Sequence, residues 1–578
     1  MKQHFGRPFI AFCFILFTAF AAIGVASAQQ TLGTLNGTVL DISGAAVPNA
    51  TVTVTDPDIG VTRTTTASKS GFYQVFNLPP GTYKISATHA GFQTTDVVGI
   101  SVTEAQATTA NIKLKVGQVS EAVEVEANPL LNATDATNGY TLSTGQIQMT
   151  PLATGSFTQL AVLAPGVNAE LLSGLDSNAG LGNQPIWANG QRDTSNTFQV
   201  NGVDATNLFN GKSSSGSNSQ RYNFNIGGGS TSASSSAGAA TIGGANPVGT
   251  SVYGSNGNSL PSPPPEFLQE LRVNTSMYDA QQGATSGAQI DASTISGTNQ
   301  FHGQIYGSLA NNFLNADPYF FKQEALLSQQ GVGAFPLSLT NPQLHRWTAG
   351  GTVGGPVKKD KLFFFLGYQF TYDSDESTGL TQMTVPSGLT NDRSVAGLQA
   401  AAESWSGSPF TKSIDPIAYD LMNAKLPDGS FLIPSNQVPG QAYAFGVPNV
   451  TLIGTSVFDA HEADAGMDYQ VNSKDRLSGK YYYQNDPVTR PYGVSQTGGF
   501  PVTQENGAQV GAIDNTILIG SNLNWEQRVG YARQYSYTYN VQTLGADATP
   551  GSPYNGQPNY GIGTGEYGVN NSVLPGLL

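Results

Sequence analysis

The sequence contains almost no cysteine and few charged residues. Its single cysteine, Cys13, lies in an apolar stretch near the start of the chain, so the remainder of the 578 residues contains none. Disulfide bonds and thiolate chemistry are therefore excluded beyond that stretch. Only 11% of the residues are charged, and 39 acidic against 25 basic side chains give a net charge of −14. An acidic chain of this kind is a poor binder of nucleic acid.

Only one apolar run is long, and it lies at the N-terminus. Lys2 and Arg7 precede the run Phe9–Val25, which is followed by Ala26-Ser27-Ala28. This order is typical of a secretory signal peptide, which we place at residues 1–28. The alternative is a membrane-anchoring helix, but the run is short for that role and no basic stop-transfer cluster follows it. If the mature chain lies in a membrane, it must therefore cross as a closed β-barrel.

Glycine and aromatic residues are plentiful instead. The chain contains 68 glycines, 24 tyrosines and 28 phenylalanines, a composition that favours turn-rich, mainly β structure over a helical enzyme. Over residues 32–116, short β-rich runs are separated by turn signals such as Ser43-Gly44 and Pro79-Pro80-Gly81. Within these runs Val52 and Val54 alternate with threonines, as expected of a strand with one buried face. The spacing predicts a small β-sandwich over residues 32–116.

Two stretches of this segment match a known domain family. They are GTVLDISGAAVPNATVTVTD at residues 37–56 and GFYQVFNLPPGTYKISATHAGF at residues 71–92. Both closely resemble the carboxypeptidase regulatory-like domain, a seven-stranded fold grouped with the carbohydrate-binding-like sandwiches. In that family the module accompanies catalytic domains and carries no catalytic residues itself. The resemblance implies a structural or ligand-contacting extension.

An acidic strand is expected after the sandwich, within residues 117–131. In SEAVEVEA, residues 120–127, valines alternate with acidic residues before Asn128-Pro129 ends the run, which predicts an extended, exposed strand. Where this sandwich precedes a receptor plug, the same place holds the TonB box, which the segment resembles. The resemblance implies that the TonB protein binds the strand by adding it, unpaired, to a sheet edge of its own. The alternative is an ordinary linker strand. The residues concerned are Glu121, Ala122, Val123, Glu124, Val125, Glu126 and Ala127.

Residues 140–300 have the pattern of a mixed α/β domain with a low-complexity insertion. Phe157, Leu160, Ala161 and Ala164 fall at helical spacing before Pro165-Gly166, which predicts one short amphipathic helix. Residues 212–265 are rich in Gly, Ser, Ala and Asn and end in three prolines. Such a composition cannot bury a core of its own, so we expect a mobile loop or a surface insertion there.

The rest of this domain resembles the plug of the Oar-like TonB-dependent receptors. QPIWANGQRDTSNTFQVNGVDATN, residues 184–207, carries the family's Asn-Gly turns at Asn189-Gly190 and Asn201-Gly202. The chain departs from the family at Asn201, where the family more often has Asp, and at Gly155, near where it often has Arg. EFLQELRVNTSMYDAQQGATSGAQIDASTISGTNQFHGQIYG, residues 266–307, resembles the family's plug-to-barrel junction. This junction is the most specific motif in the sequence.

Residues 301–578 have the pattern of membrane strands with one apolar and one polar face. Ile305 and Leu309 alternate with polar neighbours, a repeat typical of a transmembrane β-barrel. RWTAGGTVGGPVKKDKLFFFLGYQFTY, residues 346–372, joins two such strands through the short basic turn Pro356–Lys361 and resembles the Oar-like barrel. Further hairpins are expected around Ser473-Lys474-Asp475 and in Trp525–Tyr539. The side chains expected to face lipid include Trp347, Ala349, Val353, Leu366, Tyr368, Phe370 and Tyr372.

The predicted barrel is incomplete. About seven or eight strands fit the sequence, whereas plugged outer-membrane transporters use roughly 22. The stretches Asn311–Leu344 and Asp373–Phe458 are long enough to be extracellular loops. The sequence ends in SVLPGLL rather than in an amphipathic strand with a terminal aromatic residue. We expect a truncated product, a fragment or a split gene; the alternative is a genuinely small barrel, whose lumen would be too narrow for the plug.

Motifs for catalysis are absent or incomplete. His461-Glu462 begins like a zinc-binding helix, but Ala465 stands where the second histidine is required. Gly563, Gly565 and Gly568 fit a dinucleotide fingerprint without a surrounding βαβ unit, and chance matches are common in glycine-rich sequence. No serine lies in a nucleophile elbow. The sequence therefore predicts no enzyme, no cofactor and no metal.

The sequence as a whole predicts an outer-membrane TonB-dependent receptor that takes up a scarce ligand with energy supplied through TonB. The expected partners are TonB, outer-membrane lipid, and a small-molecule, glycan or peptide ligand, with no nucleic acid. The first alternative is a surface ligand-binding or adhesion protein without transport, or a non-functional receptor fragment. The second is a secreted metallocarboxypeptidase-like enzyme, suggested only by the sandwich family's name. The ligand's identity cannot be read from the residues, and the sandwich favours glycans by fold analogy alone.

Overall fold

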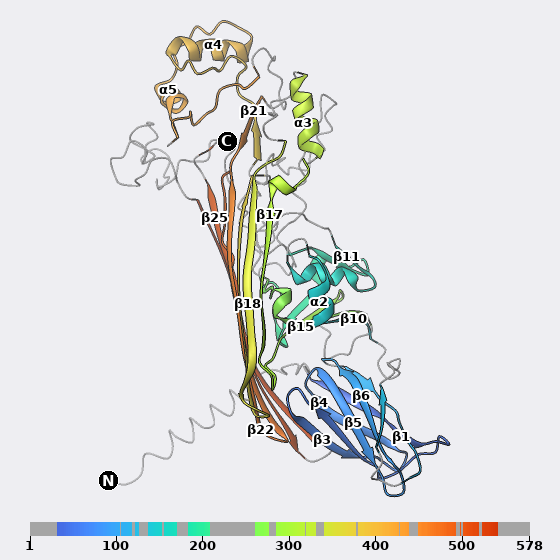
Figure 1. The fold of residues 1–578 in the computed structure, drawn as a ribbon. Helices are drawn as coiled ribbons and strands as arrows, with labels where there is room; N and C mark the ends of the chain where they lie inside the picture. Colours follow the sequence, from blue (N-terminus) through green and yellow to red (C-terminus); the bar gives the residue numbers. More distant parts are fainter. Residues whose placement is uncertain are drawn as a thin grey trace, which may run out of the picture.

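The computed structural model describes residues 32–104, 106–117, 122–126, 137–152, 155–169, 183–208, 260–276, 285–317, 319–330, 340–376, 380–426, 428–438, 449–492, 498, 501–519 and 523–540. Three β-rich parts follow one another along the chain (Figure 1). A sandwich lies at one end of a tall antiparallel sheet, and a small mixed domain lies against one face of that sheet. The expected signal peptide and the residues 212–259 of the expected insertion lie outside the described residues. The predicted fold class, mainly β with these three parts, is confirmed.

The N-terminal part is a β-sandwich of two sheets. One sheet has the order β4-β1-β7, with β8 also on β1, and the other has the order β3-β2-β5-β6-β9. β7 and β8 both pair in parallel with β1 and together resemble one interrupted strand. The predicted alternation is confirmed, because Val52 and Val54 are fully buried between the sheets. The strands are β1 (Gly33–Asp41), β2 (Thr51–Asp56), β3 (Val61–Thr66), β4 (Phe72–Leu78), β5 (Gly81–Thr88), β6 (Thr94–Val102), β7 (Ala107–Thr109), β8 (Ile112–Leu114) and β9 (Ala122–Glu126).

The middle part is a plug-like domain built on the sheet β10-β15-β16-β13-β14. The predicted Asn-Gly turn joins β13 to β14, with Asn201 at φ 52° and Gly202 at φ 71°, values that a two-residue hairpin turn requires. The predicted helix at Phe157 is a 3-10 helix, η1 (Phe157–Leu163), because Pro165-Gly166 stops it before a longer helix can form. The remaining elements are β10 (Asn138–Ser143), α2 (Thr144–Met149), β11 (Val167–Ala169), β12 (Ile186–Ala188), η3 (Asp193–Ser195), β13 (Thr197–Val200), β14 (Val203–Asp204), η5 (Pro265–Phe267), β15 (Leu268–Ser276) and β16 (Gln289–Thr294).

The third part is an eight-stranded antiparallel sheet with the order β17-β18-β19-β22-β23-β25-β24 and with β26 on β25. β17 and β26 form the two edges of the described sheet and do not pair with each other. Short turns join the strands at the sandwich end, and long connections join them at the other end (Figure 1). The strands are β17 (His302–Asn311), β18 (Leu344–Lys358), β19 (Leu362–Asp375), β22 (Ser456–Asn472), β23 (Asp475–Asn485), β24 (Val488–Arg490), β25 (Val502–Ile519) and β26 (Leu523–Asn540).

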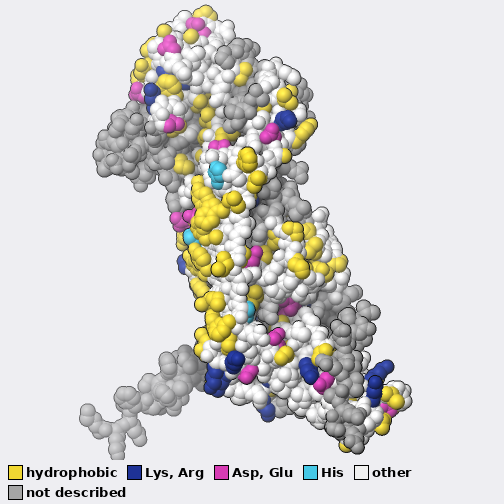
Figure 2. Space-filling model, viewed as in Figure 1, with side chains coloured by type: hydrophobic (Ala, Val, Ile, Leu, Met, Phe, Trp, Pro, Cys, Tyr) yellow, Lys and Arg dark blue, Asp and Glu magenta, His cyan; other side chains and the backbone are white. Residues whose placement is uncertain are grey.

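The two faces of this sheet differ as predicted. Phe363 and Phe365 are each 1% exposed on the inner face, whereas Leu366 and Tyr368 are 50% and 51% exposed on the outer face. Trp347 and Val353 share the outer face, as their register with β19 shows. In the space-filling view, apolar side chains form a band along the tall strands (Figure 2). Within the described ranges, no helix has the length and apolar character that a membrane span requires.

The longer connection, between β19 and β22, which the sequence predicts to be an extracellular loop, contains a folded unit. A core of Val385, Leu389, Leu398, Ala401 and Val450 holds it together. The Arg393 guanidinium lies 4.5 Å from the centre of the Phe431 ring and donates to the Ile433 carbonyl oxygen at 2.9 Å. The elements of this unit are β20 (Leu380–Met383), α4 (Val395–Ser406), α5 (Pro416–Asn423) and β21 (Val450–Ile453). The connection between β17 and β18 contains η7 (Asn312–Leu314) and α3 (Tyr319–Gln329).

Candidate partner-binding strand and the contacts behind it

The residues predicted to bind TonB form the last strand of the sandwich. Ala122, Val123, Glu124, Val125 and Glu126 make up β9, while Glu121 and Ala127 lie outside the described residues. β9 runs parallel to β6, with Ala122 opposite Thr94 and Glu126 opposite Val98. The predicted extended conformation is therefore present.

The expectation that this strand is unpaired is wrong. β9 pairs along its length with β6 and becomes the outermost strand of the sheet β3-β2-β5-β6-β9. Without β9, β6 would expose a row of unpaired backbone N–H and C=O groups, which a folded protein avoids at a sheet edge. In the described part of the chain, the far edge of β9 has no neighbouring strand.

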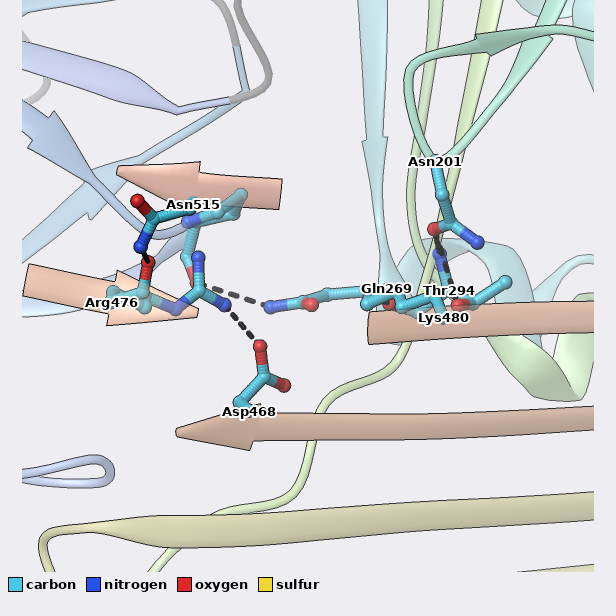
Figure 3. Close-up of polar contacts among 8 residues, drawn as sticks. Asn201, Gln269, Thr294, Asp468, Arg476, Lys480 and Asn515 are labelled. Carbon is cyan, nitrogen blue, oxygen red and sulfur yellow. Dashed lines mark hydrogen bonds and ion pairs between the residues drawn. The ribbon is translucent and has the colours of Figure 1, made fainter. Parts of the chain in front are cut away.

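The sandwich is fastened to the plug-like domain through the main chain of Glu104. The Glu104 N–H donates to both carboxylate oxygens of Glu270 at 3.2 Å, and the Glu104 carbonyl oxygen accepts from Arg272 Nη1 at 3.0 Å. Glu270 and Arg272 are two residues apart on β15 and so point to the same face. Gln269, the residue before Glu270 in β15, donates from Nε2 to the Pro80 carbonyl oxygen at 3.1 Å (Figure 3). We call Glu270 and Arg272 the clamp pair.

The surroundings of the clamp pair favour protonated carboxyl groups. Burial raises the pKa of Glu270 to about 7, although the Glu104 N–H and Arg272 oppose the rise. Burial also raises the pKa of Asp291, which lies opposite Arg272 on β16, to about 6. For Glu104 the pKa is raised by burial first and by the neighbouring Glu270 second. Glu270 and Asp291 therefore titrate near neutral pH.

The sandwich also contacts the short turns of the tall sheet. Asn299, just before β17, donates its N–H to the Asp58 carbonyl oxygen at 2.7 Å and its side-chain amide to Asp360 at 2.7 Å. Arg63 of the sandwich donates to the Ser473 carbonyl oxygen in the next turn. The sandwich thus bridges the plug-like domain and the sheet.

The tall sheet holds the plug-like domain mainly through main-chain acceptors. Lys480 donates to the Thr294 carbonyl oxygen. Gln534 Nε2 donates to the Ala205 carbonyl oxygen at 3.0 Å.

Within the plug-like domain, Asn201, where the related plugs more often have Asp, accepts from the Thr294 N–H at 2.9 Å (Figure 3). An amide oxygen fills the same acceptor role as a carboxylate oxygen, so this departure from the family pattern leaves the contact intact.

A cavity of about 240 Å³ separates α2 from the sheet. Ile147 and Thr150 line it from the α2 side, and Tyr306, Arg346 and Glu462 line it from the sheet. Arg346 pairs with Asp373 at 2.9 Å. On the plug side the cavity is also lined by Ser262, Pro265 and Glu266. Because α2 directly follows β10 in the chain, a movement of β10 would change part of the cavity wall.

The described residues show no arrangement for catalysis. No group of three or more His, Cys, Asp or Glu side chains in this part of the chain could hold a metal ion. The charged side chains at the junction bind main-chain groups or one another, as described above for Lys480 and the clamp pair.

Comparison with known proteins agrees with this architecture. Residues 34–115 match the family model of the carboxypeptidase regulatory-like domain, and residues 293–576 match that of an outer membrane beta barrel domain. The TonB-dependent transporter Oar of Myxococcus xanthus is 25% identical over 350 residues, which are 58% of this chain and 26% of that protein. The chain is an Oar-like relative of the TonB-dependent receptors. It spans about a quarter of the length of the curated relative that it matches.

Two solved structures resemble the chain more distantly. The outer membrane transporter YddB from Escherichia coli is 10% identical with a TM-score of 0.41, over 69% of this chain and 39% of that one. A mutant of the ferric enterobactin receptor PfeA from Pseudomonas aeruginosa is 10% identical with a TM-score of 0.32, over 69% and 45% of the two chains. The exact division of the chain at residues 117–131 and 140–300 stays a prediction.

The receptor-like chain is located in the outer membrane. Because membrane barrels have short periplasmic turns and long extracellular loops, the sandwich lies on the periplasmic side and the folded unit around α4 lies outside. Sequence reasoning did not single out Glu104, Glu270, Arg272 or Lys480. One signal was available. Glu270 and Arg272 are charged residues in β15, a strand that is almost entirely buried, and buried charges require partners.

Proposed function

We propose that the chain takes part in energy-coupled uptake of a scarce ligand across the outer membrane, with TonB as its periplasmic partner. The observation that carries this proposal is the order β9, β10, α2 along the chain. β9 is the candidate handle, β10 is the next described strand, and α2 lines the cavity between plug and barrel wall. A pull on β9 would therefore be transmitted along the chain to α2, which borders the cavity.

The position of β10 in its sheet supports such a movement. Among the described strands, β10 is at the edge of the plug sheet and pairs only with β15, from Asn138 opposite Ser276 to Ser143 opposite Glu270. Withdrawing an edge strand breaks one ladder and leaves the interior of the sheet paired. The energy would come from the proton gradient of the inner membrane by way of TonB, so the chain needs no nucleotide site.

The ligand's class is open. Siderophore chelates, cobalamin, glycans and peptides all fit a receptor of this design, and the sandwich tilts the proposal toward glycans by fold analogy alone. The folded extracellular unit around α4, which has its own core, favours a second candidate: a surface binding or adhesion protein without transport.

Deleting residues 120–127 tests the proposal. We expect the full chain without this segment to lose binding to the purified periplasmic domain of TonB, measured by biolayer interferometry. The matched control removes eight residues from the low-complexity insertion 212–265 and should bind as the unaltered chain does. Retained TonB binding after the first deletion would contradict the assignment of β9. In cells, unchanged ligand accumulation after that deletion would favour the adhesion protein.

A further inference from the structure

The outer face of the barrel sheet is hollowed by an apolar groove of about 730 Å³. Leu366, Met467, Ile513 and Val529 are among its lining residues, and all four are at least half exposed. The groove extends over β18, β19, β22, β23, β25 and β26 on the outer face of the sheet. This face lies in the lipid bilayer, because the plug occupies the opposite face.

Two outward-facing glycines make this groove. Gly479 lies between Met467 and Ile513 on the neighbouring strands, and Gly511 lies between Tyr481 and Tyr531. A Cβ atom added to Gly479 would meet nothing within 4 Å. The space above Gly479 is therefore open, and large side chains border it on both sides.

The periplasmic end of the groove is basic. Val357 lines the groove, and the exposed Lys358 and Lys359 follow it directly in the chain. The one acidic residue of this turn, Asp360, already accepts a hydrogen bond from the side chain of Asn299. In Figure 2 a cluster of Lys and Arg side chains lies at the lower end of the apolar band. Positive charge thus meets the apolar groove at the level of the inner-leaflet headgroups.

We propose that this groove binds one anionic phospholipid, with an acyl chain in the groove and the phosphate at Lys358 and Lys359. Apolar burial and attraction of a basic cluster to anionic headgroups are the two contributions that hold lipids to proteins. The joined apolar and basic parts match a molecule that carries both a chain and an anion. A free phosphate would use only the turn, and a zwitterionic lipid would use mainly the groove.

The test compares lipids on the purified full chain by native mass spectrometry. We expect dioleoyl phosphatidylglycerol to bind more tightly than dioleoyl phosphatidylethanolamine. Each lysine near a membrane surface contributes about fivefold in affinity, so the double substitution Lys358→Gln and Lys359→Gln should weaken phosphatidylglycerol roughly 25-fold and leave phosphatidylethanolamine nearly unchanged. Gly479→Leu, which fills open space, should weaken both lipids.

The matched control replaces Lys113 and Lys115, exposed lysines of the sandwich, with Gln and should keep the lipid preference. Equal binding of the two lipids by the unaltered chain would overturn the proposal. So would unchanged phosphatidylglycerol binding in the Lys358 and Lys359 variant, or displacement of that lipid by glycerol phosphate as readily as by fresh lipid. If Gly479→Leu does not fold, the lysine variant on its exposed turn decides the matter alone.

Discussion

Replacing Glu270 with Gln should make the junction between sandwich and plug insensitive to pH. Burial raises the pKa of Glu270 to about 7 from the ordinary 4.5. Below pH 4.5 the carboxyl is protonated in both the folded and the unfolded chain, so it contributes no pH dependence there. Between pH 4.5 and 7 the unfolded chain ionises first, so the folded state loses stability as pH rises. Above pH 7 the loss is complete.

The size of the effect follows from the pKa. One pKa unit corresponds to about 1.4 kcal/mol, so moving the pKa of Glu270 from 4.5 to about 7 corresponds to about 3 kcal/mol. The amide introduced by Glu270→Gln would stay neutral at every pH and would keep an oxygen for the Glu104 N–H. This variant should therefore be more stable than the unaltered chain at pH 8, by up to about 3 kcal/mol, and similar to it at pH 4. Burial would still raise the pKa of Asp291 and of Glu104 in this variant.

Hydrogen exchange measures this directly. The Glu104 N–H donates to Glu270, so its protection, corrected for the intrinsic exchange rate, reports the opening of the junction. In the unaltered chain we expect protection to fall by roughly 100-fold between pH 4.5 and 8, and in Glu270→Gln to change much less. Asp420→Asn, which removes an exposed carboxyl on α5, is the control and should follow the unaltered chain. Equal slopes in Glu270→Gln and the control would refute the reasoning.

Three further predictions concern other parts of the molecule. Ile85→Ala, at a fully buried position of the sandwich core, should lower the free energy of unfolding by about 2–5 kcal/mol in urea titrations, and Ile85→Val should cost much less. Arg393→Ala removes the contact with Phe431, so limited proteolysis should cut the unit around α4 sooner while the barrel strands stay protected. Asp96→Cys with Glu124→Cys should form a disulfide on mild oxidation, because the two residues are opposite each other in β6 and β9; a pair that stays reduced would contradict this register.

Local periodicity was enough to predict the sandwich strands and the faces of the barrel strands. Val52 and Val54 alternate with threonines, and the buried face follows from that alternation alone. Leu366 and Tyr368 were placed on the lipid face for the same reason, and both are about half exposed. In each case the face of the strand on which a residue lies follows from the alternation of apolar and polar residues beside it, and this alternation can be read from the sequence.

Contacts between distant segments could not be predicted in this way. Glu104 meets Glu270 across 166 positions of sequence and contributes main-chain groups to the contact. The charges of β15 therefore signal that a partner is needed, but no side-chain pattern shows that the partner is Glu104. Pairing of β9 with β6 also uses main-chain groups, and the acidic alternation of β9 gave no sign of it. The folded unit around α4 was missed because its core residues are spread over a long connection that lacks a single strong periodicity.

The pairing of β9 changes what a partner has to do. A strand that adds to the far edge of β9 would leave β9 attached to β6, and its pull would then act on the whole sandwich. The sandwich is in turn fastened to the plug by Glu270 and Arg272 and to the barrel turn through Asn299. Uptake by the proposed route therefore requires either that β9 leave β6 or that these contacts open first. The contact of the clamp pair with Glu104 changes in strength near neutral pH. A change of pH therefore distinguishes the route in which β9 leaves β6 from the route in which the contacts between domains open first.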